Sequence, residues 1–316
     1  MKRRPHRVRA ISIRRLLIGF VLLLVVISAS VSGYIASRHS TNQESYFGDF
    51  DNPDRVDVTA WITRIDTPAQ AFSMTIIDVR PHGSLADSNG NFAGDATLFT
   101  DAVGNWRAPI TAGDSAPDVE QRITVSGAVT DYPFDRYTST LELHVVDADG
   151  NELPTAITVL NTDSFFRVST AQGNAPTGGT LINLNIQRSM PTLVFAVFIM
   201  VLMLGLAGAA AVAAHYVLYW KRGLVWGACS MLAGILFALI PLRNAVPGSP
   251  PVGSIIDFGS FFIAEAIISL SLISGIIIGF RHQMAIEHSE AQLVSPVPNH
   301  EPIGEADSDD STRRQA

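Results

Sequence analysis

Four long apolar stretches constrain this chain more than any other feature, because each has about the length that a helix needs to cross a lipid bilayer. They cover residues 16–36, 193–220, 224–242 and 255–280. Charged residues make up only 16% of the 316-residue chain, against about 25% in an ordinary soluble domain. The sequence therefore predicts an α+β membrane protein with one N-terminal and three C-terminal transmembrane helices.

The first stretch has a second interpretation, a cleaved secretory signal peptide. Seven Lys and Arg residues and no acid precede Leu16, and the small residues between Ser28 and Gly33 fit a cleavage site. Apolar character resumes over residues 31–36, which favours an uncleaved signal anchor. Both interpretations leave the rest of the topology unchanged.

Positive charges near the ends of these stretches predict the orientation, because short cytoplasmic loops carry an excess of Lys and Arg. Such charges occupy residues 1–15, separate the second and third stretches, and follow the fourth at Arg281. We therefore predict that both termini are cytoplasmic, and that residues 37–190 and the outer loop 243–254 lie on the other side of the membrane.

Residues 283–316 form the tail after the predicted three-helix bundle of residues 191–282. The tail contains Pro296, Pro298 and Pro302 and is acidic and poor in apolar residues. Such a composition buries too little surface to offset the entropy of ordering, so we predict a disordered cytoplasmic tail.

Short segments that alternate apolar and polar residues fill the predicted extracytoplasmic domain. Turn signals such as Asn89-Gly90 and Asp149-Gly150 separate them, and about 150 residues suffice for one core. We predict an antiparallel β-sandwich or barrel, held by its core alone because Cys229 is the only cysteine. The predicted strands are 56–62, 72–79, 96–100, 123–126, 141–145, 156–160, 165–169 and 180–187.

No pattern in the chain predicts a catalytic, cofactor-binding or metal site. Asp87 and Asp147 each begin a run like a calcium loop, but Leu98 and Thr158 stand where that loop needs a bidentate Glu. The kinase-like triplet at 257–259 lacks the other parts of a kinase site. The extracytoplasmic domain holds nine Arg against twenty Asp and Glu, a net charge of −11, which argues against a nucleic-acid partner.

The densest aromatic cluster is a turn that precedes a predicted strand. One interpretation is structural, with the aromatic rings packing a corner of the sandwich. The other is a contact surface, because aromatic side chains are enriched at protein interfaces. We favour contact with the outer loop 243–253 over contact with a partner protein, since Pro191 ties the domain closely to the second stretch. The turn consists of Tyr132, Pro133, Phe134, Asp135, Arg136 and Tyr137.

Four polar side chains lie in or beside the transmembrane stretches, where charge is costly and often functional. We expect Arg243 and Asp257, which bracket the outer loop, to form an interfacial pair that fixes it. Glu265 lies about 12 Å deeper than Asp257 and is only a secondary partner for Arg243. His215 lies too close to the cytoplasmic end to reach Glu265.

The string ALIPLRNAVPGSPPVG at 238–253, followed by Asp257 and Glu265, resembles a family of bacterial, largely actinobacterial, multi-pass membrane proteins, domain of unknown function 4436. The turn at 132–137 and the one-plus-three arrangement of helices fit the same family. The resemblance covers about residues 20–282 and implies a location in the bacterial plasma membrane. The family has no established activity, so the resemblance implies none.

These observations favour a non-enzymatic receptor, scaffold or assembly partner of the cell envelope. It would contact the bilayer and another envelope or membrane protein, and the sequence does not indicate its oligomeric state. The alternative is a channel or transporter component, because the turn at 132–137 resembles the signature loop of pentameric ligand-gated channels. The flanking cysteines of those channels are missing, and stretch 224–242 has only Cys229 and Ser230 as polar interior groups, which argues against a pore lining.

Overall fold

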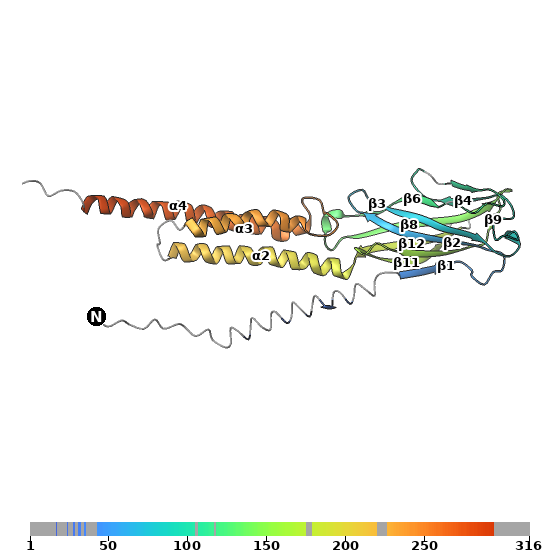
Figure 1. Ribbon diagram of the computed structural model, residues 1–316, viewed down its shortest axis with the longest axis horizontal. Coiled ribbons are helices and arrows are strands. Elements are labelled where there is room, and N and C mark those ends of the chain that lie inside the picture. The colour runs from blue at the N-terminus through green and yellow to red at the C-terminus, as the bar shows by residue number, and fades with distance from the viewer. Residues whose placement is uncertain are drawn as a thin grey trace, which may run out of the picture.

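A computed structural model describes residues 43–104, 107–116, 118–174, 179–219 and 226–293, with six further positions between residues 17 and 35. It is elongated, with a β-domain at one end and a helical bundle at the other (Figure 1). The N-terminal span predicted at 16–36 and the tail beyond residue 293 fall almost wholly outside the described residues, so they stay predictions.

Two sheets form the β-domain. The first contains, in spatial order, β1 (Gln43–Phe47), β10 (Thr155–Asn161), β2 (Val56–Asp66), β3 (Ala71–Pro81) and β6 (Val119–Thr124). The second contains β11 (Phe166–Asn174), β12 (Thr180–Arg188), β8 (Arg136–Asp147), β4 (Ala96–Thr100) and β5 (Arg107–Ile110), and β7 (Ser126–Gly127) and β9 (Glu152–Leu153) also pair with β8. Short helical turns lie at η1 (Gly83–Leu85) and η2 (Val129–Asp131).

The core of the β-domain comes from the alternating residues of both sheets. Buried positions alternate with less buried ones along β8 and β12, as expected of strands with one covered face. The largest side chains buried in the core between the sheets include Phe72, Ile62, Met74, Leu141, Leu143 and Ile182. This one continuous core confirms the predicted β-rich domain and its two-sheet form.

Every predicted strand overlaps an observed one, but the prediction of a wholly antiparallel domain was wrong. Strand β10 runs parallel to β2, with Val159 opposite Ala60. The sequence pattern indicates hairpins between neighbouring strands, whereas β10 enters the first sheet after a crossing from β8 and lies between β1 and β2. The prediction also missed β1, β5, β7 and β9.

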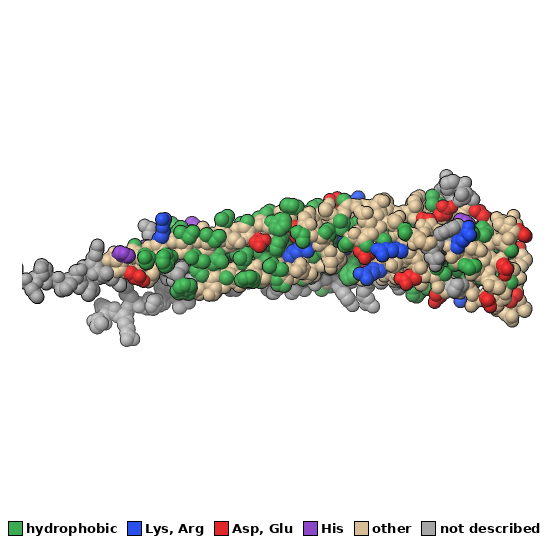
Figure 2. All heavy atoms as spheres, turned by 90° about the horizontal axis from the view of Figure 1, so that it is seen from above, with side chains coloured by type: hydrophobic (Ala, Val, Ile, Leu, Met, Phe, Trp, Pro, Cys, Tyr) green, Lys and Arg blue, Asp and Glu red, His purple; other side chains and the backbone are tan. Residues whose placement is uncertain are grey.

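Three apolar helices form the bundle: α2 (Met190–Tyr219), α3 (Trp226–Asn244) and α4 (Phe262–Leu293), the last preceded by a π-helical turn, η3 (Asp257–Phe261). All three are long and apolar enough to cross a membrane. The small residues Ala196, Ala207 and Ala264 are buried among them, which lets the helix backbones approach closely. Apolar side chains also cover the outside of the bundle, and acidic ones gather over the far end of the β-domain (Figure 2).

Helix α4 continues to Leu293, so the prediction of disorder was wrong for residues 283–293. This segment (QMAIEHSEAQL) is rich in helix-forming residues, and the first proline after it is Pro296. Gln283 Nε2 also donates a hydrogen bond to Glu287 Oε1 at 3.2 Å, one helical turn away. Extending a formed helix avoids the cost of nucleating a new one, so this short segment can stay helical.

Only Ser189 separates the last strand from the first helix of the bundle. Strand β12 ends at Arg188 and α2 begins at Met190. Ser189 precedes a helix with proline at its second residue, and its Oγ lies 3.0 Å from Thr192 Oγ1. Serine is a preferred N-cap residue, and proline is well tolerated in the first turn of a helix. The chain can therefore pass from strand to helix without a loop.

Candidate functional site at the junction of domain and bundle

The turn at 132–137 contacts the bundle through Tyr132. This side chain is fully buried and belongs to the same apolar cluster as Ile199 of α2, Val246 of the outer loop and Ile256. Phe134, in contrast, is 53% exposed. The turn therefore lies against the outer loop and the ends of the helices beside the β-domain. Tyr132, not Phe134, makes the contact.

A buried ion pair stands directly beside this contact. Arg188 Nε donates to both carboxylate oxygens of Asp135 at 3.0 Å, and Arg188 Nη2 donates to Asp135 Oδ2 at 2.9 Å. Tyr137 Oη donates to the same Oδ2 at 2.8 Å. Both charged side chains are almost completely inaccessible, at 1% and 0% exposure. The pair joins the end of β12 to the turn before β8.

Aromatic rings lie next to the guanidinium of this pair. Its central carbon is 4.9 Å from the ring centroid of Tyr132 and 4.2 Å from that of Phe166. A cation close to an aromatic ring is attracted by the ring quadrupole, more strongly where water is excluded. Arg188 was not among the site residues predicted from the sequence, although it is the last residue of a strand that precedes an apolar helix.

Two polar atoms of this cluster, Arg188 Nη1 and Tyr132 Oη, are buried and have no hydrogen-bond partner among the described residues. Gly248 of the outer loop lies against Arg188 Nη1, and a Cβ at that position would collide with it. Gly248 also has a φ of +83°, a conformation that glycine adopts at little cost. Glycine at position 248 thus avoids a collision between a side chain and the Arg188 guanidinium.

Burial extends to more alkaline pH the range over which the two phenols of the junction stay protonated. Loss of water contact raises the pKa of Tyr132 to about 12, and the charge of Asp135 adds to the shift. Burial also raises the pKa of Tyr137, together with its hydrogen bond to Asp135. Both phenols therefore act as uncharged hydrogen-bonding groups beside the Arg188–Asp135 pair.

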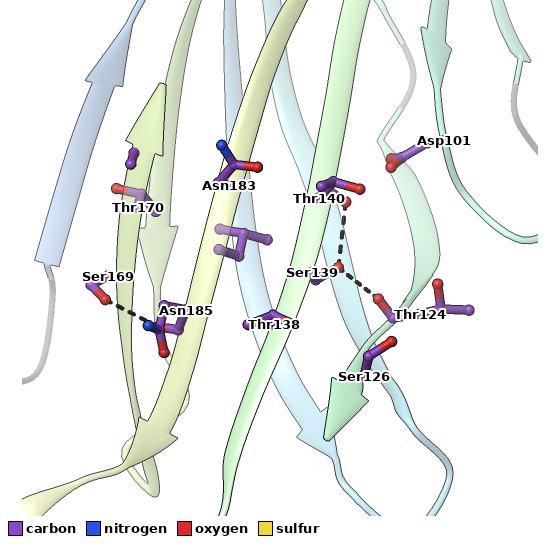
Figure 3. Close-up of a pocket in the computed structure, with 12 residues that line it drawn as sticks. Asp101, Thr124, Ser126, Thr138, Ser139, Thr140, Ser169, Thr170, Asn183 and Asn185 are labelled. Carbon is purple, nitrogen blue, oxygen red and sulfur yellow. Dashed lines mark hydrogen bonds between the residues drawn. The ribbon is translucent and has the colours of Figure 1, made fainter. Parts of the chain in front are cut away.

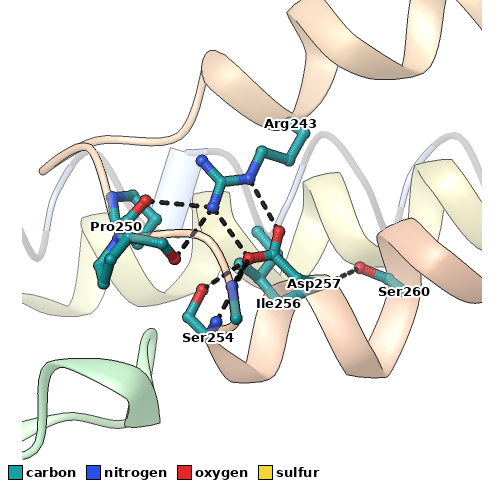
Figure 4. Close-up of polar contacts among 8 residues, drawn as sticks. Arg243, Pro250, Ser254, Ile256, Asp257 and Ser260 are labelled. Carbon is teal, nitrogen blue, oxygen red and sulfur yellow. Dashed lines mark hydrogen bonds and ion pairs between the residues drawn. The ribbon is translucent and has the colours of Figure 1, made fainter.

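The second buried pair, Arg243 with Asp257, closes the outer loop (Figure 4). Arg243 Nε donates to Asp257 Oδ1 at 2.8 Å and Nη2 donates to Oδ2 at 2.9 Å. Nη2 also donates to the carbonyl oxygens of Pro250 and Pro251, both at 3.1 Å. The backbone N–H of Gly253 donates to Asp257 Oδ2 at 2.8 Å. This is the partner that the sequence favoured for Arg243, and the pair folds the loop back on itself.

The other two polar residues singled out in the apolar stretches do not join this cluster. Glu265 is half-buried in α4, and no hydrogen bond or ion pair joins it to another described residue. His215 is exposed near the far end of α2, where its ring stacks on Tyr219 with centroids 5.9 Å apart. Glu265 and His215 therefore form no shared site with Arg243 and Asp257.

A polar cavity of about 630 Å³ lies on the outer face of the second sheet (Figure 3). Most of its lining is uncharged and able to hydrogen-bond. Register places Asn183 opposite Thr140 and Asn185 opposite Thr138, so these four side chains form two neighbouring cross-strand rows. Asp101, Thr124, Ser126, Ser139, Ser169 and Thr170 complete the polar lining. This surface has no distinct signal in the sequence, because most of its residues lie at the ordinary outward positions of strands.

Comparison with known families divides the chain at this junction. Residues 46–187 match the family model described as Domain of unknown function (DUF4436), and residues 188–282 match Domain of unknown function (DUF8686). A comparison with curated proteins found no match. The string at 238–253 on which the resemblance to the first family partly rested lies in the second match. The β-domain and the bundle are thus each similar to a domain family of unknown function, and the boundary between them falls immediately before Arg188.

Proposed function

We propose that this protein is a non-enzymatic scaffold or receptor of the bacterial cell envelope. In this proposal the N-terminal stretch and helices α2–α4 hold it in the plasma membrane with both termini in the cytoplasm. The β-domain then lies on the extracytoplasmic side and binds another envelope or membrane protein. The positive charges that flank the apolar stretches support this orientation.

The buried junction is the observation that carries the proposal. A domain that needs only to stay near a membrane can be tethered by a flexible linker. Here a single residue links strand to helix, Tyr132 packs among the helices, and the Arg188–Asp135 pair closes the base of the domain. A domain held in this way presents its outer sheet face at one height and angle above the membrane, as a scaffold requires.

The polar cavity on the second sheet is the surface we assign to the partner. Its Ser, Thr and Asn side chains offer both donors and acceptors, the residue types that give antibody contact surfaces adaptable hydrogen bonding. A polar protein surface can dock there without a large exposed apolar patch on the unbound domain.

The channel alternative receives less support from the bundle. Apolar side chains fill the middle of the described bundle, among them Met203, Leu232, Leu239 and Ile268. The buried polar side chains of these helices, Thr192, Arg243, Asp257 and Ser260, lie at the helix ends beside the β-domain and the outer loop. Glu265 is an isolated charged group in α4, and a conducting path needs a row of polar groups along a helix face.

Site-specific photo-crosslinking in intact cells tests the proposed partner. We expect a photoreactive amino acid at Thr140, in the polar cavity, to capture one recurring protein. The same amino acid at Trp61, on the other sheet, is the control and should capture none. Equal capture at both positions, or no capture at Thr140, would contradict the proposal.

Cysteine labelling tests the orientation. Single cysteines at Ser88 and Ser308, in a Cys229→Ala background, are treated with a membrane-impermeant maleimide on intact cells. We expect labelling at position 88 and none at 308 until the membrane is permeabilised. The reverse pattern would place the β-domain in the cytoplasm and refute the proposed orientation.

A further inference from the structure

A second cavity, of about 550 Å³, lies between the base of the β-domain and the outer loop of the bundle. Its walls are residues 63–68 at the end of β2, residues 162–166 before β11, Arg188, Gly248 and Ser249. We propose that this cavity binds the headgroup of a zwitterionic phospholipid, with the phosphate beside Arg188 and Arg64 and the ammonium beside Asp66 and Asp163. The inference rests on the proposed function in that it requires the helices to span a membrane.

Arg188 supplies the first argument, because one nitrogen of its buried guanidinium, Nη1, has no acceptor among the described residues. Its side chain is 1% exposed and lines the cavity, and Asp135 and Thr67 engage Nε and Nη2. Nη1 has no partner among the described residues. A buried donor without an acceptor is costly, so a ligand oxygen that reached Nη1 would remove that cost. Phosphate oxygens are strong acceptors for a guanidinium.

The loop that closes the cavity supplies the second argument. Gly248 and Ser249 both have positive φ values, of +83° and +41°. Such a conformation is uncommon for serine, and strained backbone gathers at ligand sites. Any side chain at position 248 would press on Arg188 Nη1. Glycine at 248 therefore leaves Nη1 with no side chain pressed on it, and the strained backbone beside it is that of Ser249.

The charges of the walls indicate a zwitterionic ligand in preference to a simple anion. Arg64 is exposed at the cavity and adds a second cation. Asp163 is fixed by backbone N–H groups, with Ile65 donating to Oδ2 at 2.8 Å and Phe165 donating to Oδ1 at 2.9 Å. Asp66 Oδ1 accepts in the same way from the Ala69 N–H at 3.1 Å. Fixed carboxylates would repel a bare phosphate but attract an ammonium group that accompanies it.

The position of the cavity matches the headgroup layer of a bilayer. Helix α2 begins at Met190, two residues after Arg188, so the cavity lies level with the ends of the apolar helices. Phe165 on its wall is 47% exposed and Met190 is 58% exposed. Headgroups occupy the polar layer immediately outside the hydrocarbon core. A lipid whose chains lay along the bundle would therefore bring its headgroup to this opening.

Lipid-dependent thermal stability of the full-length, delipidated protein in detergent tests the proposal. We expect dihexanoyl-phosphatidylethanolamine to raise the melting temperature in a saturable way. Its apparent affinity should fall at least about tenfold in Gly248→Ala and in Arg64→Gln, the second of which changes only an exposed wall residue. Gly253→Ala is the matched control for the first, because Gly253 also has a positive φ but faces open space. Arg80→Gln, an exposed arginine on β3, is the control for the second.

Three outcomes would overturn the proposal. The first is stabilisation by dihexanoylglycerol, which has no phosphate, equal to that by the phospholipid. The second is an affinity unchanged in both Gly248→Ala and Arg64→Gln, and the third is equal or tighter binding of dihexanoyl-phosphatidylglycerol or of free phosphoethanolamine. None of these outcomes depends on photo-crosslinking at Thr140 or on cysteine labelling at positions 88 and 308. Failure of the lipid proposal is therefore distinguishable from failure of the proposed function.

Discussion

The two buried Arg–Asp pairs have the same chemistry but opposite relations to the sequence. Arg243 and Asp257 are 14 residues apart and close one loop, whereas Arg188 and Asp135 are 53 residues apart and join two strands at the base of a domain. The first pair depends only on local chain geometry. The second exists only after the second sheet has formed, so it reports on the tertiary fold.

The two pairs also differ in how far their hydrogen-bonding capacity is used. Two proline carbonyls and the N–H of Gly253 complete the Arg243–Asp257 pair. Arg188 is packed between aromatic rings and keeps one nitrogen without an acceptor. Buried charges are most stable when their remaining donors and acceptors are satisfied. The loop pair meets this condition, whereas the junction pair keeps the unpaired donor on which the proposed lipid site depends.

The largest effect should come from removing the acid of the junction pair. We expect Asp135→Ala to lower the free energy of unfolding by about 3–5 kcal/mol, because Arg188 would remain charged and buried without a counterion. Urea unfolding in detergent measures it. Asp131→Ala, an exposed acid in the preceding turn, is the control and should change stability by less than about 0.5 kcal/mol. Similar losses in the two variants would contradict a buried, paired Asp135.

The next effect compares two aromatic residues of the same turn. We expect Tyr132→Ala to cost about 3 kcal/mol, because it leaves a cavity among the helices, while Phe134→Ala costs less than about 1 kcal/mol. Thermal unfolding of the full chain measures both. If Phe134→Ala were the more damaging change, Phe134 would have to be the residue that contacts the bundle.

A double-mutant cycle on the loop pair should show strong coupling. We expect Asp257→Asn and Arg243→Gln each to cost about 2 kcal/mol, and the double variant to cost little more than either single one, since both remove the same interaction. Detergent melts of the four proteins give the coupling energy. Fully additive losses would indicate that the two side chains do not interact.

The smallest effect concerns alkaline pH. The pKa of Tyr132 is raised from its ordinary value of 10.0 to about 12, so the folded state holds this proton where the unfolded state releases it. The stability that this shift contributes is complete below about pH 10 and is lost as the pH rises towards 12. By pH 11 the free energy of unfolding should have fallen by about 1 kcal/mol for this reason. A denaturation series from pH 9 to 11 should show a shallower decline in Tyr132→Phe than in the wild type. Parallel declines would mean that Tyr132 does not resist ionisation.

The contrast between the two Arg–Asp pairs also explains why only the loop pair could be predicted from the sequence. Arg243 and Asp257 are the two charges that bracket a short loop between apolar stretches, so composition and spacing alone suggest that they pair. Arg188 meets Asp135 because β12 lies antiparallel to β8 with Gln187 opposite Arg136, which places the next residues across from each other. That register depends on two strands distant in the sequence becoming neighbours in the second sheet, and it has no local signal.

The same distinction applies to the fold. Strand positions and the three apolar helices follow from alternation and hydropathy, which act over a few residues. The parallel pairing of β10 with β2 and the polar cavity around Asn183 and Thr140 depend on which strands become neighbours. Contact between the turn at 132–137 and the outer loop was predicted from the sequence, because Pro191 ties the domain closely to the bundle. Which residue makes the contact, Tyr132 and not Phe134, depends on how the domain sits on the helices.

Because a single residue, Ser189, connects β12 to α2, a small rotation at this residue would displace the far end of α2 like the long arm of a lever. A 30-residue helix is about 45 Å long, so a tilt of about 5° at Ser189 would move the far end of α2, at Tyr219, by about 4 Å. The Arg188–Asp135 pair and the Ser189 N–H bond to the Phe165 carbonyl hold the short arm of this lever. A ligand that shifted the base of the sandwich would therefore produce a larger displacement at the far end of α2.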